Sequence, residues 1–442
     1  MNRANEGALR PTRTRNWVIV FAVALAVIQY VDRVCIAKAM PSIRGELHFS
    51  DVETGYIFGA FTLAYALFEI PSGWLGDRFG PRKVLLRVVL WWSAFTAATG
   101  WVTSAAAMIV VRFLFGAGEA GCFPNVTKAF TSWLPRSEWF RGQAVLWLSA
   151  RWGGAATPLL VVAVLRIVSW RMAFQVFAVL GLAWAIIFFR WFRDSPHEHP
   201  GVNKAERQLL YESVKLASHE APIPWRLFLR SPTAWLLWLQ YAALSYVWYF
   251  YITWFPTYLD SVSHGRLGPA ALAVLAGLPL FGGGFGSLLA AGLEAPVGRL
   301  LASEARARKA IAVVGFLAAA ACFLASIYAA DPVTMAVLMG FAGMFNDFVM
   351  PSSWRTCMSI GGRFAATFSG SMNMFGNLGG FVAPIAMGYI LSITGAYTLA
   401  LFISSGMYVV GALCWMLLDP ETRLDRDYGT TPVAPTEAEA PL

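Results

Sequence analysis

The sequence predicts an all-α integral membrane protein with twelve transmembrane helices in two halves of six. Of the 442 residues, 57% are hydrophobic and 13% are charged, a composition too apolar for a soluble protein of this length. The apolar residues form twelve segments, each near the roughly 20 residues that span a bilayer. A polar stretch after the sixth segment divides them six and six. Because lipid-exposed backbone must bond within its own segment, the spans are helical.

The expected spans follow one another with short connections. They cover residues 17–39, 51–72, 84–104, 106–130, 141–165, 171–192, 233–258, 270–294, 310–330, 333–357, 364–390 and 394–418. The expected domains are a basic cytoplasmic N-terminus (1–16), an N-terminal six-helix bundle (17–192), a cytoplasmic linker (193–232), a C-terminal six-helix bundle (233–418) and a disordered cytoplasmic tail (419–442). Within the linker, "NKAERQLLYESVKLA" has the spacing of a surface helix.

The basic residues predict the orientation in the membrane. Lys and Arg gather in the N-terminus, the linker and the loops on the same side, whereas the loops on the other side hold only Arg44, Arg166, Arg171 and Arg266. This asymmetry places both termini in the cytoplasm, in a protein integral to the cytoplasmic (inner) membrane. It also explains the net charge of +9, so no nucleic-acid partner is expected. The first apolar segment carries charges and lacks a small-residue cleavage site, so we expect a retained span.

The two halves repeat each other. "RWGGAATP" (151–158) matches "NLGGFVAP" (377–384) at an offset of 226. Gly116, Glu119, Pro124 and Lys128 match Gly343, Asn346, Pro351 and Arg355 at an offset of 227. Matching Gly/Pro-interrupted helices in two repeats predict a transporter whose site lies between the halves near the membrane midplane. The alternative is that small residues only permit close helix packing.

The repeat also differs between the halves in its charges. Arg112, Glu119 and Arg151 of the first half correspond to Met339, Asn346 and Asn377 of the second. We therefore expect the ionisable groups of the site in the N-terminal half, and neutral hydrogen-bonding groups opposite them.

Charged residues lie deep inside the expected spans. The stretch "VIQYVDRVCIA" (27–37) holds Asp32 beside Arg33, and charges at such depth are rarely kept without a function. At a rise of about 1.5 Å per residue, Asp32 lies about 12 Å and Arg112 about 9 Å from the outer ends of their spans, so the two could pair. Glu119 shares a helix face with Arg112, and Arg151 is also near mid-span. The alternative is a static ion-pair network that holds helices together.

The loop after the second span carries a recognisable motif. "GWLGDRFGPRK" (73–83) resembles the loop signature of the major facilitator superfamily. The matching residues are Gly73, Asp77, Arg78, Gly80, Arg82 and Lys83. Asp77 can cap a helix end and pair with an arginine across the cytoplasmic face, as a latch for one conformation. The equivalent loop of the second half is degraded, so we expect an asymmetric latch.

Three intramembrane motifs give a narrower resemblance. "YVDR" (30–33), "RFLFGAGEAGCFP" (112–124) and "YFYITWFPTYL" (249–259) are similar to the anion:cation symporter family, which includes bacterial sugar-acid transporters and vesicular glutamate and sialic-acid transporters. The resemblance implies a proton-coupled carrier of organic anions. It implies proton coupling at Asp32 and Glu119. It implies substrate binding by Arg33, Arg112, Tyr30, Tyr65, Ser352 and Asn373, to which the repeat adds Asn377.

One residue departs from that family. Arg151 stands where sugar-acid carriers often have a neutral amide, which makes a more charged or aromatic acid more credible. We count Arg151 among the expected substrate-binding residues, because an arginine fork binds a carboxylate with two parallel hydrogen bonds. Protonation of Asp32 or Glu119 would release a partner arginine for the substrate, since burial favours the neutral form of a carboxyl group.

The expected function is secondary active, proton-coupled symport of an organic anion by alternating access, with a sugar acid, dicarboxylate or aromatic carboxylate as substrate. The alternatives are an exchanger of phosphorylated or dicarboxylate anions and a drug effluxer. No enzyme activity, cofactor or metal site is expected, because the five cysteines form no CxxC pair and all five histidines lie outside the spans. The expected partners are the small anion, protons and membrane lipid, and the expected state is a monomer.

Three charged residues receive no role from the sequence. Lys128 and Arg355 lie near the cytoplasmic ends of their spans, where they could form gating pairs or face water. Glu69 precedes the 73–83 loop and could pair with one of its arginines.

Overall fold

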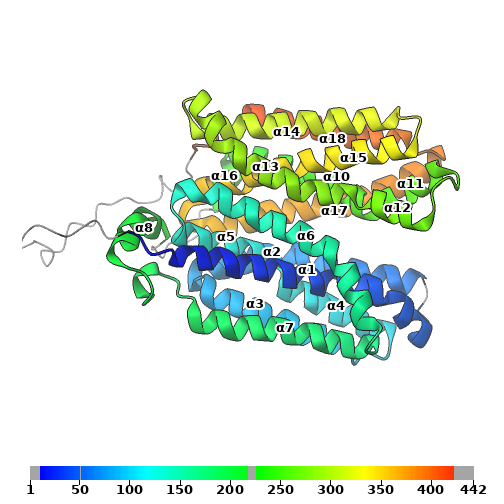
Figure 1. The fold of residues 1–442 in the computed structure, drawn as a ribbon, viewed down its shortest axis with the longest axis horizontal. Helices are drawn as coiled ribbons and strands as arrows, with labels where there is room; N and C mark the ends of the chain where they lie inside the picture. The colour runs from blue at the N-terminus through cyan, green and yellow to red at the C-terminus, as the bar shows by residue number, and fades with distance from the viewer. Residues whose placement is uncertain (1–9, 50, 218–224, 423–442) are drawn as a thin grey trace, which may run out of the picture.

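The computed structural model describes residues 10–49, 51–217 and 225–422, and its regular elements there are all helical. Figure 1 shows two helical bundles lying along each other, one formed by α1–α7 and the other by α10–α18. Helix α8 (Lys204–Ala217) projects at one end of the molecule. We call this end the α8 end and the opposite one the far end.

The N-terminal half accounts for six of the expected spans. Its helices are α1 (Thr14–Leu47), α2 (Asp51–Phe79), α3 (Pro81–Thr99), α4 (Ala105–Glu119), α5 (Cys122–Trp133), α6 (Trp139–Leu165) and α7 (Trp170–Trp191). The fourth expected span is thus divided into α4 and α5. A short 3-10 turn, η1 (Arg136–Glu138), joins α5 to α6.

The C-terminal half follows a linker that contains η2 (Pro196–Glu198), α8 and α9 (Trp225–Arg230). Its helices are α10 (Pro232–Thr253), α11 (Phe255–Ser263), α12 (Pro269–Ala276), α13 (Leu278–Leu300), α14 (Glu304–Ile327), α15 (Pro332–Phe348), α16 (Met350–Gly361), η3 (Gly362–Phe364), α17 (Ala365–Thr394) and α18 (Thr398–Leu417). The expected surface helix is present as α8. The expected tail falls largely on residues 423–442, outside the described residues, as do residues 1–9 of the expected N-terminus.

The twelve-span architecture is confirmed. Eight stretches of the described chain are long and apolar enough to cross a membrane by themselves, and one of them, Pro332–Leu391, covers two spans. Helices α2, α3 and α10 complete the set of twelve. Several helices begin with a side chain that accepts a hydrogen bond from a backbone N–H of the first turn, which satisfies a donor that the helix leaves free. These caps are Ser104, Ser169, Ser231, Ser303 and Asp331.

Two helix breaks occupy equivalent places in the two halves. The first lies between α4 and α5, at Ala120 and Gly121, where Gly121 has a φ of 84°. The second lies between α15 and α16, at Val349. With the repeat offset of 227, these positions coincide within about two residues. Glu119 and Asp347 therefore stand just before matching interruptions, the place where repeat transporters bind substrate.

The halves meet over the part of the molecule that runs from mid-depth to the α8 end. Helix α2 packs on α17, α6 on α13, and α5 on α16 and α17. The contact of α2 with α17 is close enough that a Cβ on Gly73 would lie 2.4 Å from the carbonyl oxygen of Ala366. Farther along, Phe140 of α6 packs with Ala290 of α13. Cross-half packing thus closes the molecule at the α8 end.

A second close contact lies inside the C-terminal half and sets the position of α15. A Cβ on Gly286 of α13 would lie 1.8 Å from the carbonyl oxygen of Met344, so only glycine allows α13 to approach α15 this closely. The same side of α13 presents Gly283 to the carboxylate of Asp347, and a Cβ there would lie 2.7 Å from Oδ2. Glycine therefore places α15, and with it Asp347, at its observed depth.

We predict that Gly286→Ala destabilises the protein and that Gly292→Ala does not. Both glycines lie on α13, but a Cβ on Gly292 would meet no atom within 4 Å. Overpacking of this kind costs about 1–3 kcal/mol. Thermal unfolding of both variants in one detergent should show a lower Tm for Gly286→Ala only. Equal Tm values for the two variants would contradict the close approach of α13 and α15.

Candidate functional site

Arg33 and Glu119 form an ion pair at mid-depth in the N-terminal half. Arg33 of α1 donates through Nε and Nη2 to Oε1 of Glu119, at 2.9 and 2.6 Å. Gln29, one turn earlier on α1, donates to the same oxygen at 2.8 Å. The Glu119 side chain is fully buried, whereas that of Arg33 is 23% exposed. The pair therefore combines a partly accessible guanidinium with a fully buried carboxylate that fixes its position.

Aromatic rings surround the Arg33 guanidinium. Its Cζ lies 4.6 Å from the ring centre of Tyr65, 5.1 Å from that of Phe61 and 5.6 Å from that of Tyr30. Such rings attract a cation while leaving its N–H groups free to bind an acceptor. Ala37, one turn from Arg33 toward the far end, lines an open recess of about 590 Å³ together with Met40, Arg44 and Phe58. The recess thus comes within one helical turn of Arg33 on its far-end side.

The expected ion pair between Asp32 and Arg112 is absent from the described residues. Both side chains are buried, yet neither carboxylate oxygen of Asp32 has a hydrogen-bond partner, and Nε and Nη1 of Arg112 have none either. Arg112 lies over the ring of Phe115 at 4.1 Å. The depth estimate gave the right height but the wrong pairing. Asp32 and Arg33 are adjacent on one helix and point about 100° apart, and it is Arg33 that faces the end of α4.

A second ion pair crosses between the halves, and the sequence did not predict it. Arg151 of α6 donates through Nε to Oδ2 of Asp347 on α15 at 2.5 Å, and through Nη2 to Oδ1 at 3.1 Å. Both side chains are buried. The expectation of an entirely neutral C-terminal face is therefore wrong. The repeat alignment pointed to Asn346, which is next to Asp347, but the carboxylate stands one residue out of register with Glu119.

Further contacts fix both partners of this pair. The Arg151 guanidinium stacks on Trp248 of α10, with its Cζ 3.4 Å from the ring centre, and donates through Nη1 to the hydroxyl of Tyr30 at 3.2 Å. Asn346 donates through its amide to Oδ1 of Asp347 at 3.0 Å. Arg151 is thus fully engaged, unlike Arg33. Its Tyr30 contact also links the cross-half pair to the rings around Arg33.

The expected neutral residues of the C-terminal half lie on α16 and α17. Asn377 accepts a hydrogen bond from the hydroxyl of Tyr249 at 3.2 Å and donates to the carbonyl oxygen of Asn373 at 2.9 Å. The amide of Asn373 donates to Oε1 of Glu69 on α2 at 2.5 Å. Ser352 is fully buried, and its hydroxyl has no partner among the described residues. Glu69 therefore bonds across the halves. Its partner is Asn373, and not an arginine of the 73–83 loop, which the sequence had allowed.

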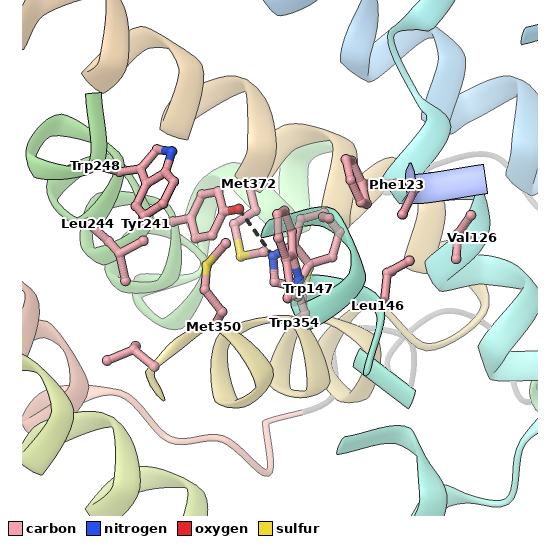
Figure 2. Packing of buried hydrophobic residues seen from close by; sticks show 14 of the residues in the cluster. Phe123, Val126, Leu146, Trp147, Tyr241, Leu244, Trp248, Met350, Trp354 and Met372 are labelled. Atoms are coloured by element: carbon pink, nitrogen blue, oxygen red, sulfur yellow. Dashed lines mark hydrogen bonds between the residues drawn. The ribbon is translucent and has the colours of Figure 1, made fainter. Parts of the chain in front are cut away.

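An aromatic cluster closes the space between Arg151 and the α8 end. Figure 2 shows Phe123 and Trp147 of the N-terminal half against Trp354 and Tyr241 of the C-terminal half. Trp147 stacks on Phe123 with ring centres 4.8 Å apart and lies 5.4 Å from Trp354. The indole N–H of Trp354 donates to the hydroxyl of Tyr241 at 3.2 Å. Trp147 is one turn from Arg151, so these rings form the floor of the site on its α8 side.

In the 73–83 loop, Asp77 connects the halves. Its carboxylate accepts hydrogen bonds from the backbone N–H groups of Ala366 and Thr367, at 3.2 and 2.7 Å, and so caps the start of α17. It also pairs with Lys128 of α5 at 3.2 Å, and Lys128 in turn donates to the carbonyl oxygen of Arg363. Asp77 thus caps a helix end, as the sequence predicts, but its ion-pair partner is Lys128 and not an arginine.

The other residues of the motif hold the N-terminal half together. Gly80 has a φ of 81°, and a Cβ on it would lie 2.7 Å from the carboxylate of Asp194. Asp194 accepts from the backbone N–H of Arg82 at 2.8 Å. Burial raises the pKa of the Asp194 carboxyl, and the Arg82 N–H opposes that shift, as does the more distant charge of Lys83. Arg78 lies over the rings of its own helix, so it makes no cross-half contact that we observe.

The two half-molecules close differently at the α8 end. Arg355, the repeat counterpart of Lys128, pairs with Glu304 of its own half at 3.1 Å. It also lies over the ring of Trp139, 5.1 Å from the ring centre. Lys128 bridges the halves by its hydrogen bond to the carbonyl oxygen of Arg363, whereas Arg355 crosses by this ring contact among the described residues. The latch geometry is therefore asymmetric.

The fold and the site together define a membrane transporter: two six-helix repeats with charged groups held between them beside matching helix breaks. The sequence profile of the Major Facilitator Superfamily matches residues 22–384, and the chain belongs to this family. A human organic anion transporter, MFSD10, has the same fold with a TM-score of 0.70 at 14% identity, covering 91% of this chain and 99% of its own. The proton:xylose symporter XylE matches with a TM-score of 0.76 at 12% identity, covering 93% and 97%.

Curated relatives support the narrower resemblance to carriers of organic anions. A probable sulfoacetate transporter, SauU, of Cupriavidus necator is 33% identical over 418 residues, which are 93% of this chain and 96% of that protein. A D-galactonate transporter of Escherichia coli is 31% identical over 428 residues, 93% and 97% of the two chains. The recognition of this chain as a transporter of the anion-carrying branch, and not an enzyme, is confirmed.

We predict that the Arg151–Asp347 pair shows strong coupling in stability. Arg151→Gln or Asp347→Asn alone leaves one charge buried without its partner, a change that typically costs about 3–5 kcal/mol. The double variant removes both charges and should recover most of the loss. Thermal unfolding in detergent gives the coupling, and additive losses in the double variant would contradict a direct pair.

We predict that Asp77→Asn opens the α8 end. The variant weakens the cap on α17, which connects the halves. It also removes the ion pair that holds Lys128 in place for its hydrogen bond to Arg363 of the other half. Spin labels on Ser137 and Leu300 report the separation of the halves at this end, and the distribution should gain a longer distance. Arg78→Gln is the matched control in the same motif and should leave the distribution unchanged. An unchanged distribution in Asp77→Asn would show that the contacts of Asp77 do not hold the α8 end closed.

Proposed function

We propose that this chain is a secondary active transporter that carries a small organic anion together with protons by alternating access. The observation behind the proposal is the Arg33–Glu119 pair. An accessible guanidinium lies at mid-depth beside a helix break, and its counter-charge is a buried carboxylate on another helix of the same half. This arrangement can exchange one anion, Glu119, for another, the substrate.

The exchange couples the substrate to a proton. An incoming carboxylate competes with Glu119 for the N–H groups of Arg33. Protonation of Glu119 weakens its hold on Arg33 and frees the planar fork for the substrate. The released carboxyl group stays in a buried environment, which favours its neutral form. Asp32, which forms no ion pair among the described residues, is a second group that can take a proton there.

The opposite face of the site favours a hydroxylated or otherwise polar substrate with one strongly bound anionic group. Arg151 is neutralised by Asp347, so the C-terminal half offers hydroxyl and amide groups, such as Tyr249 and Asn377. The relatives are named for sulfoacetate and D-galactonate, which are small, oxygen-rich acids. We propose a substrate of this class, bound by Arg33 through its acid group and by the C-terminal half through its polar body.

We propose that the α8 end faces the cytoplasm of a cell whose inner membrane holds the protein. The Lys and Arg residues of the loops gather at this end and in the linker. The described conformation is then closed toward the cytoplasm and open toward the outside, where the recess beside Ala37 lies one helical turn from Arg33. Substrate would enter from outside, and separation of the halves at the α8 end would release it inside.

We predict distinct defects for the two members of the ion pair. In proteoliposomes, Arg33→Ala should abolish uptake of the acids tested, because the anion loses its cation. Glu119→Gln should keep exchange of substrate across the membrane and lose accumulation driven by a proton gradient. The assay follows uptake of labelled D-galactonate and sulfoacetate with and without an inward proton gradient.

The matched control is Arg166→Ala, which removes an exposed arginine at the far end of α6. It should transport like the wild type. Transport by Arg33→Ala at the wild-type rate would overturn the proposed anion site. Wild-type accumulation that ignores the proton gradient and responds to an anion on the other side would instead identify an exchanger.

A further inference from the structure

Glu69 is a buried carboxyl group that takes no part in the proposed exchange at Arg33. It lies on α2 at the contact with α17 and is fully buried. Its Oε1 accepts the hydrogen bond from Asn373 of the other half, whereas Oε2 has no partner. The contact is tight: a Cβ on Gly370 would lie 2.8 Å from the carbonyl oxygen of Glu69.

The surroundings of Glu69 supply little charge to balance an ionised carboxylate. Helix α17, which covers it, contains no Asp, Glu, Lys, Arg or His between Ala365 and Thr394. The ionisable groups that face it from the N-terminal half are Tyr65 on α2, Arg33 on α1, Glu119 on α4 and Cys122 on α5. Of these only Arg33 is a cation, and it is paired with Glu119. No Lys or Arg of the described residues is within ion-pair distance of Glu69.

A charge in such a place is costly. An ionised carboxylate removed from water and held by neutral groups, here the Asn373 amide and the Tyr65 hydroxyl, loses several kcal/mol of solvation that these groups do not restore. The protonated carboxyl can accept the Asn373 hydrogen bond through one oxygen while carrying its proton on the other, unpartnered one. The closed contact between α2 and α17 therefore suits the neutral form of Glu69.

Opening of the α8 end changes this environment. Asn373 and the covering face of α17 belong to the half that must move away from α2, so separation breaks the Glu69–Asn373 bond and admits water. Water stabilises the ionised form, and the proton leaves to the α8 side. By linkage, a group that holds its proton more tightly in one conformation stabilises that conformation as the pH falls.

We propose that Glu69 is an additional proton site of the transport cycle, whose proton is held while α2 and α17 are in contact and released at the α8 end when they separate. Tyr65 offers a route for loading. Its ring lies one turn before Glu69 and contacts the Arg33 guanidinium, and its hydroxyl bonds to Glu69. The hydroxyl can therefore pass a proton to Glu69 while receiving one from the side of Arg33. The inference rests on the proposed function, but it concerns the interface of the halves and not the anion site itself.

The test is the pH dependence of opening at the α8 end, measured on the full chain without substrate. Spin labels on Ser137 and Leu300 give the ratio of open to closed populations between pH 5.5 and 8.5. In the wild type the ratio should rise with pH, by at most about tenfold per unit for one linked proton. Glu69→Gln, which cannot release a proton, should lose the part of this dependence that Glu69 contributes, and Glu69→Asp should keep it with a shifted midpoint.

Glu46→Gln is the matched control, because it removes a carboxylate that pairs with Arg171 at the far end. It should behave like the wild type. A Glu69→Gln profile that coincides with the wild-type profile would overturn the inference, and so would a Glu69→Asp profile as flat as that of Glu69→Gln. These outcomes require a folded protein only. A wild type that opens with pH through Glu69, yet carries neither D-galactonate nor sulfoacetate down a proton gradient, would support the Glu69 site and count against the proposed function.

The number of protons carried provides a second readout. In proteoliposomes that accumulate a labelled acid, the proton-to-anion ratio follows from the gradient at which net flux stops. Glu69→Gln should lower this ratio by one and leave exchange intact. An unchanged ratio would show that Glu69 carries no proton through the cycle.

Discussion

The ion pair between Arg151 and Asp347 is the interaction on which the joining of the two halves depends at mid-depth. A buried arginine in a membrane protein needs a counter-charge, and here the counter-charge belongs to the other half. The stacking of the guanidinium on Trp248 and its hydrogen bond to Tyr30 extend the contact to α10 and α1. The floor of rings around Trp147 begins one turn below. Movement of one half on the other must therefore either turn about this pair or break it.

The pair also decides which arginine is available to a ligand. Arg151 has donors committed to Asp347 and Tyr30, and it is almost fully buried. Arg33 is paired as well, but its side chain remains partly exposed. The three arginines at similar depth thus differ: Arg151 is buried in an ion pair, Arg112 is buried without one among the described residues, and Arg33 is paired but partly exposed. Of the three, Arg33 combines a charge with an accessible surface, which is why the proposed anion site is placed there.

Much of this architecture could be predicted from the sequence. Segment length and charge gave the twelve spans, and the matching Gly and Pro positions gave the repeat and the broken helices. The pairings could not be predicted in the same way. Distance along a helix fixes the height of a side chain, but its direction depends on helix rotation, so Asp32 and Arg112 share a depth without forming an ion pair. The repeat does not indicate Asp347, because Glu119 aligns with Asn346 and the carboxylate of the second half lies one residue later.

Contacts between the halves were also beyond the reach of sequence patterns, for a different reason. The capping of α17 by Asp77 and the bond between Glu69 and Asn373 exist in a conformation closed at the α8 end. A transporter must break such contacts during its cycle, so its sequence has to be compatible with more than one set of contacts between the halves. The residues could be recognised as buried and polar, whereas their partners depend on the state of the molecule.

Under the proposed function, charge balance gives a physical reason for the anion to bind together with protons. The described residues around the site include three arginines, Arg33, Arg112 and Arg151, and four carboxyl groups, Asp32, Glu69, Glu119 and Asp347. With all of them ionised the site has a net charge of −1, and a bound monoanion would make it −2. Burial of that charge is unfavourable, and two protons restore neutrality. Asp347 is held by Arg151, so under the proposed function the two protons would be shared among Asp32, Glu119 and Glu69. The partners of these three carboxyl groups would change, either in the exchange at Arg33 or when the α8 end opens.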